Sequence, residues 1–348
     1  MRLVSLSQLN FRNLRFDCLT FQSGIVAVVG SNAAGKSNLL AAAYLGSTAT
    51  LASGSVAEML TWGQDEAYVA AEIEHQDGVS RVQVGLSTGQ RRVRLDGQTA
   101  RVHEVAQQVS AVLLTPEDSD LVHGPPALRR DYLDSLLSKL SARYTLMLRE
   151  YQRVLEQRNA LLRTRPHDDS LPDWTARFVE LGTELTSLRR RVLARLNPLA
   201  AAAYADISGT GQVLDVSLRV SHGEALLAEA VAERAREEAA RGMTLVGPHR
   251  DDLDLNLDGH PLRSFGSRGE ARTAATALRV SEYRLLSDRH GEPPVLLIDD
   301  FTAELDAGRR EYLLRLAADT PQAIVSGTEP PPRWDQLIRL EAGAPHVA

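Results

Sequence analysis

One eight-residue motif constrains this chain more than any other part of the sequence. Residues 30–37 are GSNAAGKS and match G-x-x-x-x-G-K-[ST], the pattern of a phosphate-binding loop. An apolar run precedes the motif at residues 25–29, and a helix-like run follows it at residues 38–45. Strand, loop and helix in this order form the context in which the pattern binds nucleotide phosphates, so we expect an α/β domain around it.

The residue types of the motif suit a phosphate group. Glycines allow successive backbone N–H groups to face an anion, and the start of the following helix adds positive potential. Lys36 is expected to reach the β- and γ-phosphates, and the Ser37 hydroxyl to bind Mg²⁺. The alternative interpretation, a glycine turn that caps a core helix, needs no ligand. The loop residues predicted to bind ATP are Gly30, Ser31, Asn32, Ala33, Ala34, Gly35, Lys36 and Ser37.

A second half of the same site is predicted near the other end of the chain. Residues 295–298 are apolar and lead into Asp299 and Asp300, which is the Walker B arrangement. Asp299 is expected to hold the Mg²⁺ shell, and Asp300 to orient or deprotonate the attacking water. About 260 residues separate the two motifs, so a large insertion is expected to split the nucleotide domain.

Composition limits the class of protein. With 348 residues the chain suggests about two domains, and 43% hydrophobic and 24% charged residues are typical of a soluble globular protein. No apolar run could span a membrane and the N-terminus does not have the order of a signal peptide, so we expect a cytoplasmic protein without a membrane partner. Cys18 is the only cysteine, and it is predicted to be a core thiol in a strand.

The remaining pattern predicts a β-rich part and a helical part. Strands are expected at 3–11 and 16–21, and an antiparallel meander from residue 68 to a turn at 96–97. Apolar residues at helical spacing predict a helix from about residue 125 to 155 and another from 174 to 196, which ends at Asn197-Pro198 and completes an antiparallel hairpin. We therefore predict a head made of residues 1–120 and 244–348, and an inserted helical lobe at 121–243.

The predicted hairpin is locally basic. Residues 121–205 contain 14 Lys and Arg and 9 Asp and Glu, a net charge of +5, whereas the whole chain has a net charge of −6. Two interpretations stay open, a solvated helix surface and a surface that faces DNA.

A serine and glycine motif precedes the Walker B strand. Residues 264–270 are SFGSRGE and lead into an alanine- and leucine-rich helix. Ser267 and Gly269 at the start of that helix could donate hydrogen bonds to an anion, and we expect them to serve the γ-phosphate of another subunit. The alternative is an ordinary N-cap.

Taken together, these motifs resemble an ABC-type ATPase head of the SMC-like kind, and more narrowly the RecF recombination-mediator family. The strings that carry the narrower resemblance are LNFRN at 9–13, PED at 116–118, GPHRDDL at 247–253 and DD at 299–300, followed by ELD at 304–306. The resemblance covers nearly the whole chain. It implies a mixed sheet with an antiparallel β lobe and an inserted α-helical lobe, and it aligns Asp306 with the D-loop aspartate.

The resemblance also implies an activity. It predicts a weak, DNA-stimulated ATPase in which ATP induces a head-to-head homodimer, with Lys36 and Asp300 as catalytic residues. It further predicts binding of double-stranded DNA at gaps or single-strand junctions, and help in loading RecA with RecO and RecR. His249 and Arg250 could contact nucleotide or DNA, or could brace a strand entry. The other candidates are a different short-armed SMC-like ATPase and, from another class, a P-loop phosphotransferase.

The sequence departs from the family pattern at several positions. Ala33 stands where glycine is usual, and Glu270 where glutamine is expected. Asp300 replaces a glutamate and is one methylene shorter, which favours slow turnover. No histidine follows residues 323–325, which leaves Ser326 or Thr328 at the switch position.

Overall fold

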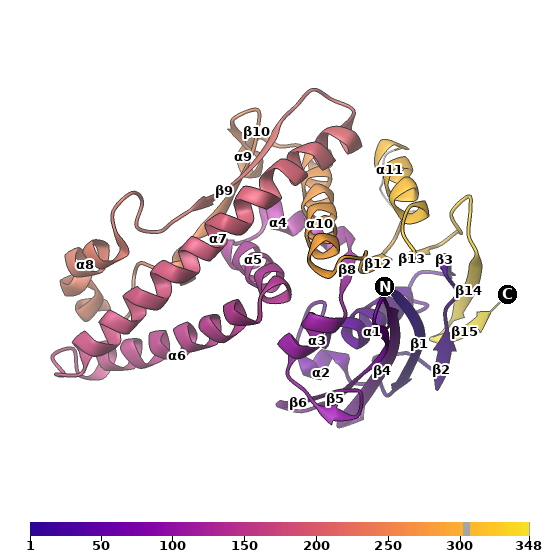
Figure 1. Cartoon of the computed structure of the whole chain (residues 1–348), viewed down its shortest axis with the longest axis horizontal. Helices are drawn as coiled ribbons and strands as arrows, with labels where there is room; N and C mark the ends of the chain where they lie inside the picture. Colours follow the sequence, from indigo (N-terminus) through magenta and orange to yellow (C-terminus); the bar gives the residue numbers. More distant parts are fainter. Residues whose placement is uncertain (302–306, 348) are drawn as a thin grey trace. The chain divides into compact units, whose positions relative to one another are not determined.

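The computed structural model describes residues 1–301 and 307–347 (Figure 1). The chain forms two compact units. The head unit contains Met1–Ser119, Ala202–Gly211 and Arg272–Ala348, and the helical unit contains Asp120–Ala201 and Gln212–Ala271. None of the helices within the described ranges is both long and apolar enough to cross a membrane.

A six-stranded sheet of the head unit carries the phosphate-loop motif. Its order is β15-β14-β3-β13-β12-β8, and only β15 runs antiparallel to its neighbour. The strands are β3 (Gly24–Val29), β8 (Ala111–Leu114), β12 (Val295–Ile298), β13 (Gln322–Gly327), β14 (Gln336–Glu341) and β15 (Ala344–Val347). The central strands are buried along their length, as expected for parallel strands covered on both faces. Helix α1 (Lys36–Thr48) follows β3 and buries 11 of its 13 residues.

The second sheet of the head unit is antiparallel, as the alternating pattern predicts. Its order is β2-β1-β4-β5-β6-β7, with β1 (Arg2–Leu9), β2 (Cys18–Thr20), β4 (Glu66–His75), β5 (Gly78–Ser87), β6 (Gln90–Leu95) and β7 (Gln98–Thr99). Alternate residues of β4 and β5 join α1 in one hydrophobic core. Cys18 lies in a strand as predicted, but the prediction of a core thiol is wrong, because Leu19 is the inward residue of β2 and the two-residue period turns Cys18 to solvent. The helices of this unit include α2 (Val56–Met59), α3 (Val102–Gln108), most of α10 (Arg268–His290) and α11 (Ala307–Ala318).

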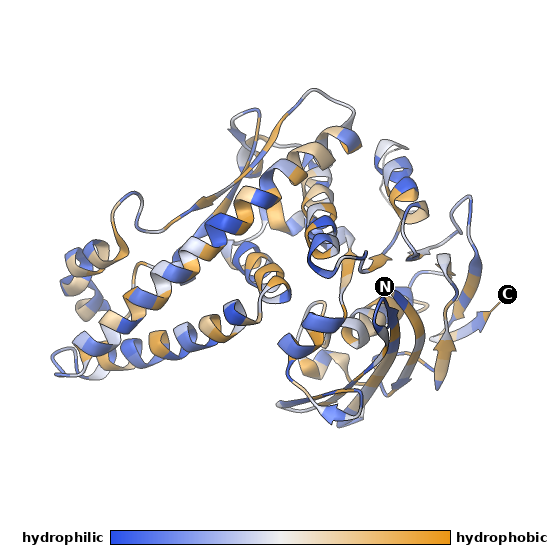
Figure 2. Cartoon of the chain, viewed as in Figure 1, coloured by the Kyte–Doolittle hydropathy of each residue, from blue (hydrophilic) through white to orange (hydrophobic). Residues whose placement is uncertain are grey.

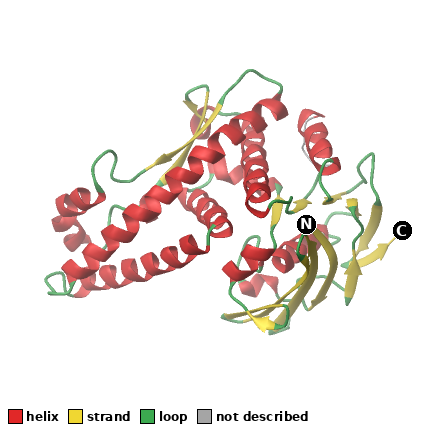
Figure 3. Ribbon diagram, viewed as in Figure 1, coloured by secondary structure: helices red, strands yellow, loops and turns green. Residues whose placement is uncertain are grey.

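The helical unit is built from helices and a small antiparallel sheet in the order β11-β10-β9 (Figure 3). Its helices are α4 (Asp120–His123), α5 (Pro126–Leu140), α6 (Ala142–Thr164), α7 (Leu171–Ser208, up to residue 201), α8 (Leu227–Arg241) and α9 (Leu262–Phe265). Its strands are β9 (Leu214–Arg219), β10 (Asp252–Leu257) and β11 (His260–Pro261). Hydrophobic and hydrophilic residues alternate along α6 and α7, as the sequence periodicity predicts (Figure 2).

The first arm of the hairpin is two helices rather than one. Ser141 ends α5, and its hydroxyl accepts a hydrogen bond from the Tyr144 backbone N–H at 3.3 Å, so it also caps the start of α6. Serine is favoured at such a position because its side-chain oxygen accepts a hydrogen bond from a first-turn N–H group that has no partner within the helix.

The second arm does not end at Pro198 as predicted. Helix α7 continues through Pro198 to Ser208. The preceding Asn197 holds the chain on β9, since its side chain donates to Asp215 Oδ1 at 3.1 Å and accepts from the Val216 backbone N–H at 2.7 Å. These contacts help to keep the helix in place where the proline removes a backbone donor.

The contacts divide the chain differently from the predicted boundaries. The expected insertion ends at residue 243, whereas the helical unit runs to residue 271. Strand β10 pairs with β9 in antiparallel register from Asp252↔Arg219 to Leu257↔Leu214. Because these pairs join segments on either side of residue 243, the hairpin that contains β10 groups with the helices.

Candidate functional site

The phosphate-loop motif forms a tight connection between β3 and α1. Gly35 has φ 105° and is the N-cap of α1, whose first turn contains no acidic residue. A Cβ atom at Gly30 would lie 2.5 Å from the Leu340 carbonyl oxygen, so the backbone approach at this position requires glycine. The Lys36 ammonium group donates to the carbonyl oxygens of Gly30 and Ser31, each at 2.9 Å. The loop is therefore a compact cradle with a cation at its centre.

The sheet brings the acidic pair to the same edge as this loop. Strand β13 lies between β3 and β12, and all three are parallel, so their carboxyl ends meet. Asp299 and Asp300 follow β12 and are half-buried. Asp300 adopts φ 50°, a left-handed conformation that non-glycine residues adopt at an energetic cost.

Ser326 connects the two acids. It lies on β13 and is 1% exposed. Its hydroxyl donates to Asp299 Oδ1 at 2.5 Å and accepts from the Asp300 backbone N–H at 2.9 Å. Ser326, one of the two residues expected at the switch position, is thus in direct contact with the acidic pair.

The donor set at this edge fits a magnesium ion that is shared with phosphate. The Ser37 hydroxyl is exposed and the Asp299 carboxylate is half-buried, and both are oxygen donors of the kind Mg²⁺ prefers. Within residues 1–301 and 307–347, no group of three or more His, Cys, Asp and Glu side chains could hold a metal ion. An ion at this edge would therefore need phosphate and water oxygens to complete its shell.

A charged pair joins the turn after β8 to helix α10. Asp118 lies in the 3₁₀ turn Pro116–Ser119 and accepts from the Thr115 backbone N–H at 2.8 Å. Arg279 of α10 donates to Asp118 at 2.8 Å and to the buried Glu282 at 2.8 Å. The turn and the acids Asp299 and Asp300 line one pocket of about 320 Å³. Sequence reasoning did not identify Arg279, because 161 residues separate it from Asp118.

The serine and glycine motif forms the start of α10. The Ser267 backbone N–H donates to Glu270 Oε2 at 2.7 Å, and the Glu270 N–H donates to Ser267 Oγ at 3.2 Å. This is a capping box, which the S-x-x-E spacing could have indicated. The bond from Ser267 lowers the pKa of Glu270. Ser267 and Gly269 are both exposed in the helical unit. Asp306, the predicted D-loop residue, lies outside the described residues.

His249 belongs to the interior packing of the helical unit. Its Nδ1 atom lies 2.7 Å from the Tyr151 hydroxyl, and its ring packs edge-on against Phe178 with centroids 6.1 Å apart. Burial lowers the pKa of His249 to about 4. These contacts favour the bracing role among the interpretations left open, whereas the neighbouring Arg250 is exposed.

The rest of the GPHRDDL string also makes contacts inside the helical unit. The Asp252 carboxylate accepts hydrogen bonds from two of the three guanidinium nitrogens of Arg129, at 2.7 and 2.9 Å. Asp251 accepts from the Ser221 backbone N–H at 2.8 Å, and burial raises its pKa. This string therefore holds β10 against α5 and the loop before α8.

Buried cations account for part of the positive charge of residues 121–205. Four of the 14 cationic side chains are buried, namely Arg129, Lys139, Arg158 and Arg189. Arg158 pairs with Glu238 at 2.6 Å, and Arg189 with Asp134 at 2.8 Å. The exposed cations are Arg143, Arg149, Arg153, Arg163, Arg165, Arg190, Arg191 and Arg195.

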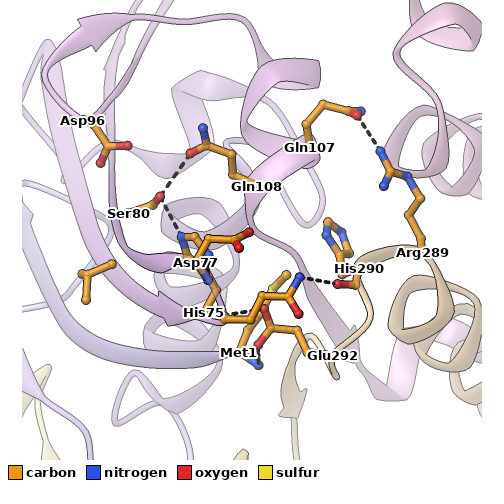
Figure 4. A pocket seen from close by; sticks show the side chains of 12 residues that line it. Met1, His75, Asp77, Ser80, Asp96, Gln107, Gln108, Arg289, His290 and Glu292 are labelled. Carbon is orange, nitrogen blue, oxygen red and sulfur yellow. Dashed lines mark hydrogen bonds and ion pairs between the residues drawn. The ribbon is translucent and has the colours of Figure 1, made fainter.

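Another pocket of the head unit, of about 520 Å³, contains none of the predicted site residues (Figure 4). Its side chains bond mainly to one another. Ser80 contacts His75 at 3.0 Å and Gln108 at 3.1 Å, and Arg289 donates to Gln107 at 2.6 Å. The pocket is polar, and two of its lining side chains, Gln107 and His290, each have a buried Nε2 atom without a hydrogen-bond partner within the described ranges.

Comparison with known proteins identifies the family. The sequence matches the family described as RecF/RecN/SMC N terminal domain over residues 2–331. It is 46% identical over 343 residues to the DNA replication and repair protein RecF of Deinococcus radiodurans, covering 99% of this chain and 95% of the relative. The chain belongs to the RecF family. A RecF of Synechococcus sp. strain JA-3-3Ab is 36% identical, covering 92% and 89% of the two chains.

Solved structures agree with this assignment. The structure of the recombination mediator protein RecF with ATP, described as part of the RecFOR pathway, has a TM-score of 0.92 at 27% identity and covers 99% of this chain and 97% of that one. An Smc head domain from Pyrococcus furiosus has a TM-score of 0.55 at 16% identity over 99% and 95% of the chains. The predicted fold, an ABC-type ATPase head with an inserted helical lobe, is therefore confirmed, and so is the resemblance to RecF.

Proposed function

We propose that this RecF-family protein binds ATP at the edge formed by β3, β13 and β12. The observation that carries the proposal is that three parallel strands of one sheet bring the Lys36 loop and the Asp299–Asp300 pair together. Nucleotides bind at the carboxyl ends of parallel strands, and this is where both motifs end. The solved relative in complex with ATP supports the same choice of ligand.

The chain's own groups then have separate tasks. The backbone N–H groups of the loop and the Lys36 ammonium hold the β- and γ-phosphates, after Lys36 exchanges its bonds to the loop carbonyls for bonds to phosphate. Asp300 orients the attacking water and accepts its proton. A bound Mg²⁺ held by Ser37 and Asp299 would neutralise phosphate charge. Because the short Asp300 side chain reaches less far than glutamate, hydrolysis is slow and serves as a switch.

We further propose that ATP joins two copies of the chain head to head. Ser267 and Gly269 are exposed at the start of α10, where the Ser267 hydroxyl and the backbone at Gly269 can close over the γ-phosphate held by a second copy. The local capping box keeps the Glu270 carboxylate on its own helix, which reduces its repulsion of that phosphate. ATP then stabilises the dimer by mass action, and hydrolysis releases it.

We propose that this dimer binds double-stranded DNA at gaps or single-strand junctions. The exposed arginines of α6 and α7 supply contacts to phosphate, so binding is expected to depend on salt and little on sequence. Relatives named as DNA replication and repair proteins, and the RecFOR pathway of the solved relative, support action with RecO and RecR in loading RecA. A preference for gapped over intact duplex separates this function from that of another short-armed SMC-like ATPase.

Gel filtration in magnesium, with and without millimolar ATP, tests the proposal. The wild-type chain should shift from monomer to dimer with ATP. Lys36→Met should bind no ATP and stay monomeric, whereas Asp300→Asn should form a longer-lived dimer. Ser267→Ala should bind ATP as a monomer but dimerise poorly, and Ser264→Ala, three residues away and also exposed, is its matched control. A wild-type chain that binds ATP and remains monomeric would exclude the ATP-induced head-to-head dimer.

A further inference from the structure

Trp62 is the most exposed large hydrophobic side chain among the described residues, at 99% of its surface. The residues that follow it, Gly63, Gln64 and Asp65, are exposed and not apolar. The indole is thus a single plate rather than part of an apolar patch of the kind that binds another protein. Single exposed hydrophobic residues are common, so its position has to decide whether it has a role.

The backbone holds Trp62 at the tip of a tight turn. The Gln64 N–H donates to the Thr61 carbonyl at 3.0 Å, and Gly63 has φ 80°, which places Trp62 second in a four-residue turn. The Thr61 N–H donates to the Asn10 carbonyl at 2.8 Å, and the Asn10 side chain donates to Gln64 at 3.2 Å. The turn is therefore tied to the end of β1 at both of its ends.

Arg12 is fixed beside this turn in a costly conformation. Its φ is 49°, in the left-handed region. Its N–H donates to the Met59 carbonyl at 2.8 Å, its carbonyl accepts from the Thr61 hydroxyl at 2.6 Å, and its guanidinium donates to Asn38 at 2.8 Å. Backbone strain of this kind persists where the surroundings over-determine it, and it is concentrated at ligand sites.

Both residues line the pocket that contains the phosphate loop. Its volume is about 740 Å³, and its walls include Trp62, Arg12, Leu60, Lys36 and Ser37. Pockets for small ligands typically have about 300 to 1,000 Å³. The site therefore has room for more than a triphosphate, and Lys36 and Trp62 both line it.

We propose that Trp62 is the stacking platform for the purine base of the nucleotide whose phosphates the Lys36 loop holds. This inference rests on the proposed ATP binding and names the group that positions the base. An aromatic plate on a rigid turn loses little entropy on binding, and every base offers a π-face to it. Trp62 is a positioning residue that raises affinity for the nucleoside part without touching the phosphates.

Fluorescence tests this contact directly. The chain has three tryptophans, Trp62, Trp174 and Trp334, so Trp174→Phe/Trp334→Phe leaves Trp62 as the only indole. ATP should quench its emission, whereas inorganic tripolyphosphate, which has no base, should bind without quenching. If calorimetry shows ATP binding to this variant while the emission stays unchanged, the proposal is overturned.

Affinity gives the second test. Trp62→Ala should weaken ATP binding by about 5- to 150-fold, the range expected when an aromatic side chain that stacks on one base is replaced by alanine. Binding of tripolyphosphate should be unchanged. Trp62→Phe should retain most of the affinity. Trp334→Ala removes a 45% exposed tryptophan that does not line this pocket, and it should bind ATP like wild type.

The outcomes separate this inference from the proposed function. Equal ATP affinity of wild type and Trp62→Ala overturns the role of Trp62 and leaves ATP binding intact. A wild-type chain that binds neither ATP nor tripolyphosphate overturns both. Lys36→Met should lose both ligands, which distinguishes the phosphate contact from the base contact.

Discussion

The Ser326 hydroxyl lies 2.5 Å from Asp299 Oδ1 and accepts a hydrogen bond from the Asp300 backbone N–H at 2.9 Å. One side chain on β13 thus contacts both the proposed metal ligand and the proposed water-orienting residue, which directly follow β12. Because Ser326 is 1% exposed, water does not easily replace it. The hydroxyl of Ser326 therefore helps to hold the two acids in place.

Ser326→Ala should therefore impair hydrolysis more than nucleotide binding. Loss of a hydrogen bond to a carboxylate costs about 1.5 to 3 kcal/mol, so kcat should fall about tenfold or more while the Kd for ATP changes little. Ser326→Thr keeps the hydroxyl and should restore part of the rate. Steady-state ATPase assays and calorimetric titration measure the two quantities. Unchanged kcat in the alanine variant would contradict the role of Ser326.

The parts of this site that follow from local patterns could be predicted from the sequence. The motifs around Lys36 and Asp299 each have a strand before them, and parallel strands place both at one sheet edge. Contacts between distant residues have no such local signal. Arg279 meets Asp118 across 161 residues, and the turn that holds Trp62 depends on bonds to Asn10. Such pairs arise from the sheet topology, which a single sequence does not specify.

The predictions that failed were those in which tertiary contacts outweigh a local preference. Pro198 should end a helix, yet the side chain of Asn197 anchors the same stretch on β9 and the helix continues. Cys18 has the hydrophobicity of a core residue, yet the register of β2 turns it outward.

Ala33→Gly should stabilise the phosphate loop. Ala33 has φ 63°, a conformation that costs an L-residue with a Cβ about 1 kcal/mol. Glycine removes this cost but loses more entropy on folding, so the free energy of unfolding should rise by roughly 0.5 kcal/mol. Urea unfolding measures the change. Ala34→Gly is the matched control, because Ala34 is 4% exposed and is not among the positive-φ residues, and it should be destabilised instead.

The Arg158–Glu238 pair should be critical for the helical unit. Its side chains are 3% and 0% exposed, and Arg158 also donates to Thr244 at 2.6 Å. Arg158→Met leaves a buried carboxylate without its cation, which should cost about 3 to 5 kcal/mol of unfolding free energy. Arg158→Met/Glu238→Gln removes both charges and should be more stable than the single variant.

An exposed pair on α8 provides the control for this prediction. Arg234 and Glu237 are 51% and 40% exposed and lie 3.2 Å apart. Arg234→Met should change the unfolding free energy little, because solvent screens such pairs. If the single variant Arg158→Met unfolded at the same urea concentration as Arg234→Met, the buried pair would have no special role.

Stability should depend on pH through His249. Burial lowers its pKa to about 4 in the folded chain, below the value near 6.5 expected when unfolded. Between these values the unfolded chain binds more protons, so the contribution of neutral His249 is complete above about pH 6.5 and is lost as the pH falls toward 4. The Tyr151 hydroxyl and the Thr244 carbonyl face the ring, and the bond to Thr244 partly opposes the decrease in pKa. The cations Arg250, Arg130 and Arg158 add to the effect of burial by disfavouring protonation.

His249→Gln keeps a polar partner for Tyr151 but does not titrate. The difference in unfolding free energy between wild type and this variant should therefore grow from pH 5 to about pH 7 and then stay constant. Urea unfolding at several pH values measures it. His123→Gln changes an exposed histidine of the same unit and serves as the matched control. A difference for His249→Gln that stays flat over this range would contradict burial as the cause.

The exposed arginines of α6 should carry part of the affinity for DNA. Arg149 and Arg153 are one helical turn apart and both exposed, so they can contact neighbouring phosphates. Arg149→Gln/Arg153→Gln should weaken duplex binding and reduce the slope of log K against log salt by about 2, one for each phosphate that an arginine no longer neutralises. Fluorescence anisotropy with a gapped duplex, at several salt concentrations and with ATP present, measures both effects.

A control with the same change of charge separates direct binding from net charge. Arg234→Gln/Arg236→Gln removes two exposed arginines from α8, where four glutamates accompany three arginines. A long-range effect of charge would weaken DNA binding equally in both double variants, whereas direct phosphate contacts on α6 lower the slope only in the first. If the two salt slopes were equal, α6 would not be the DNA-binding surface. The buried arginines Arg129, Arg158 and Arg189 cannot reach DNA phosphates, so the next surface to test would be α7. Its exposed arginines are Arg190, Arg191 and Arg195.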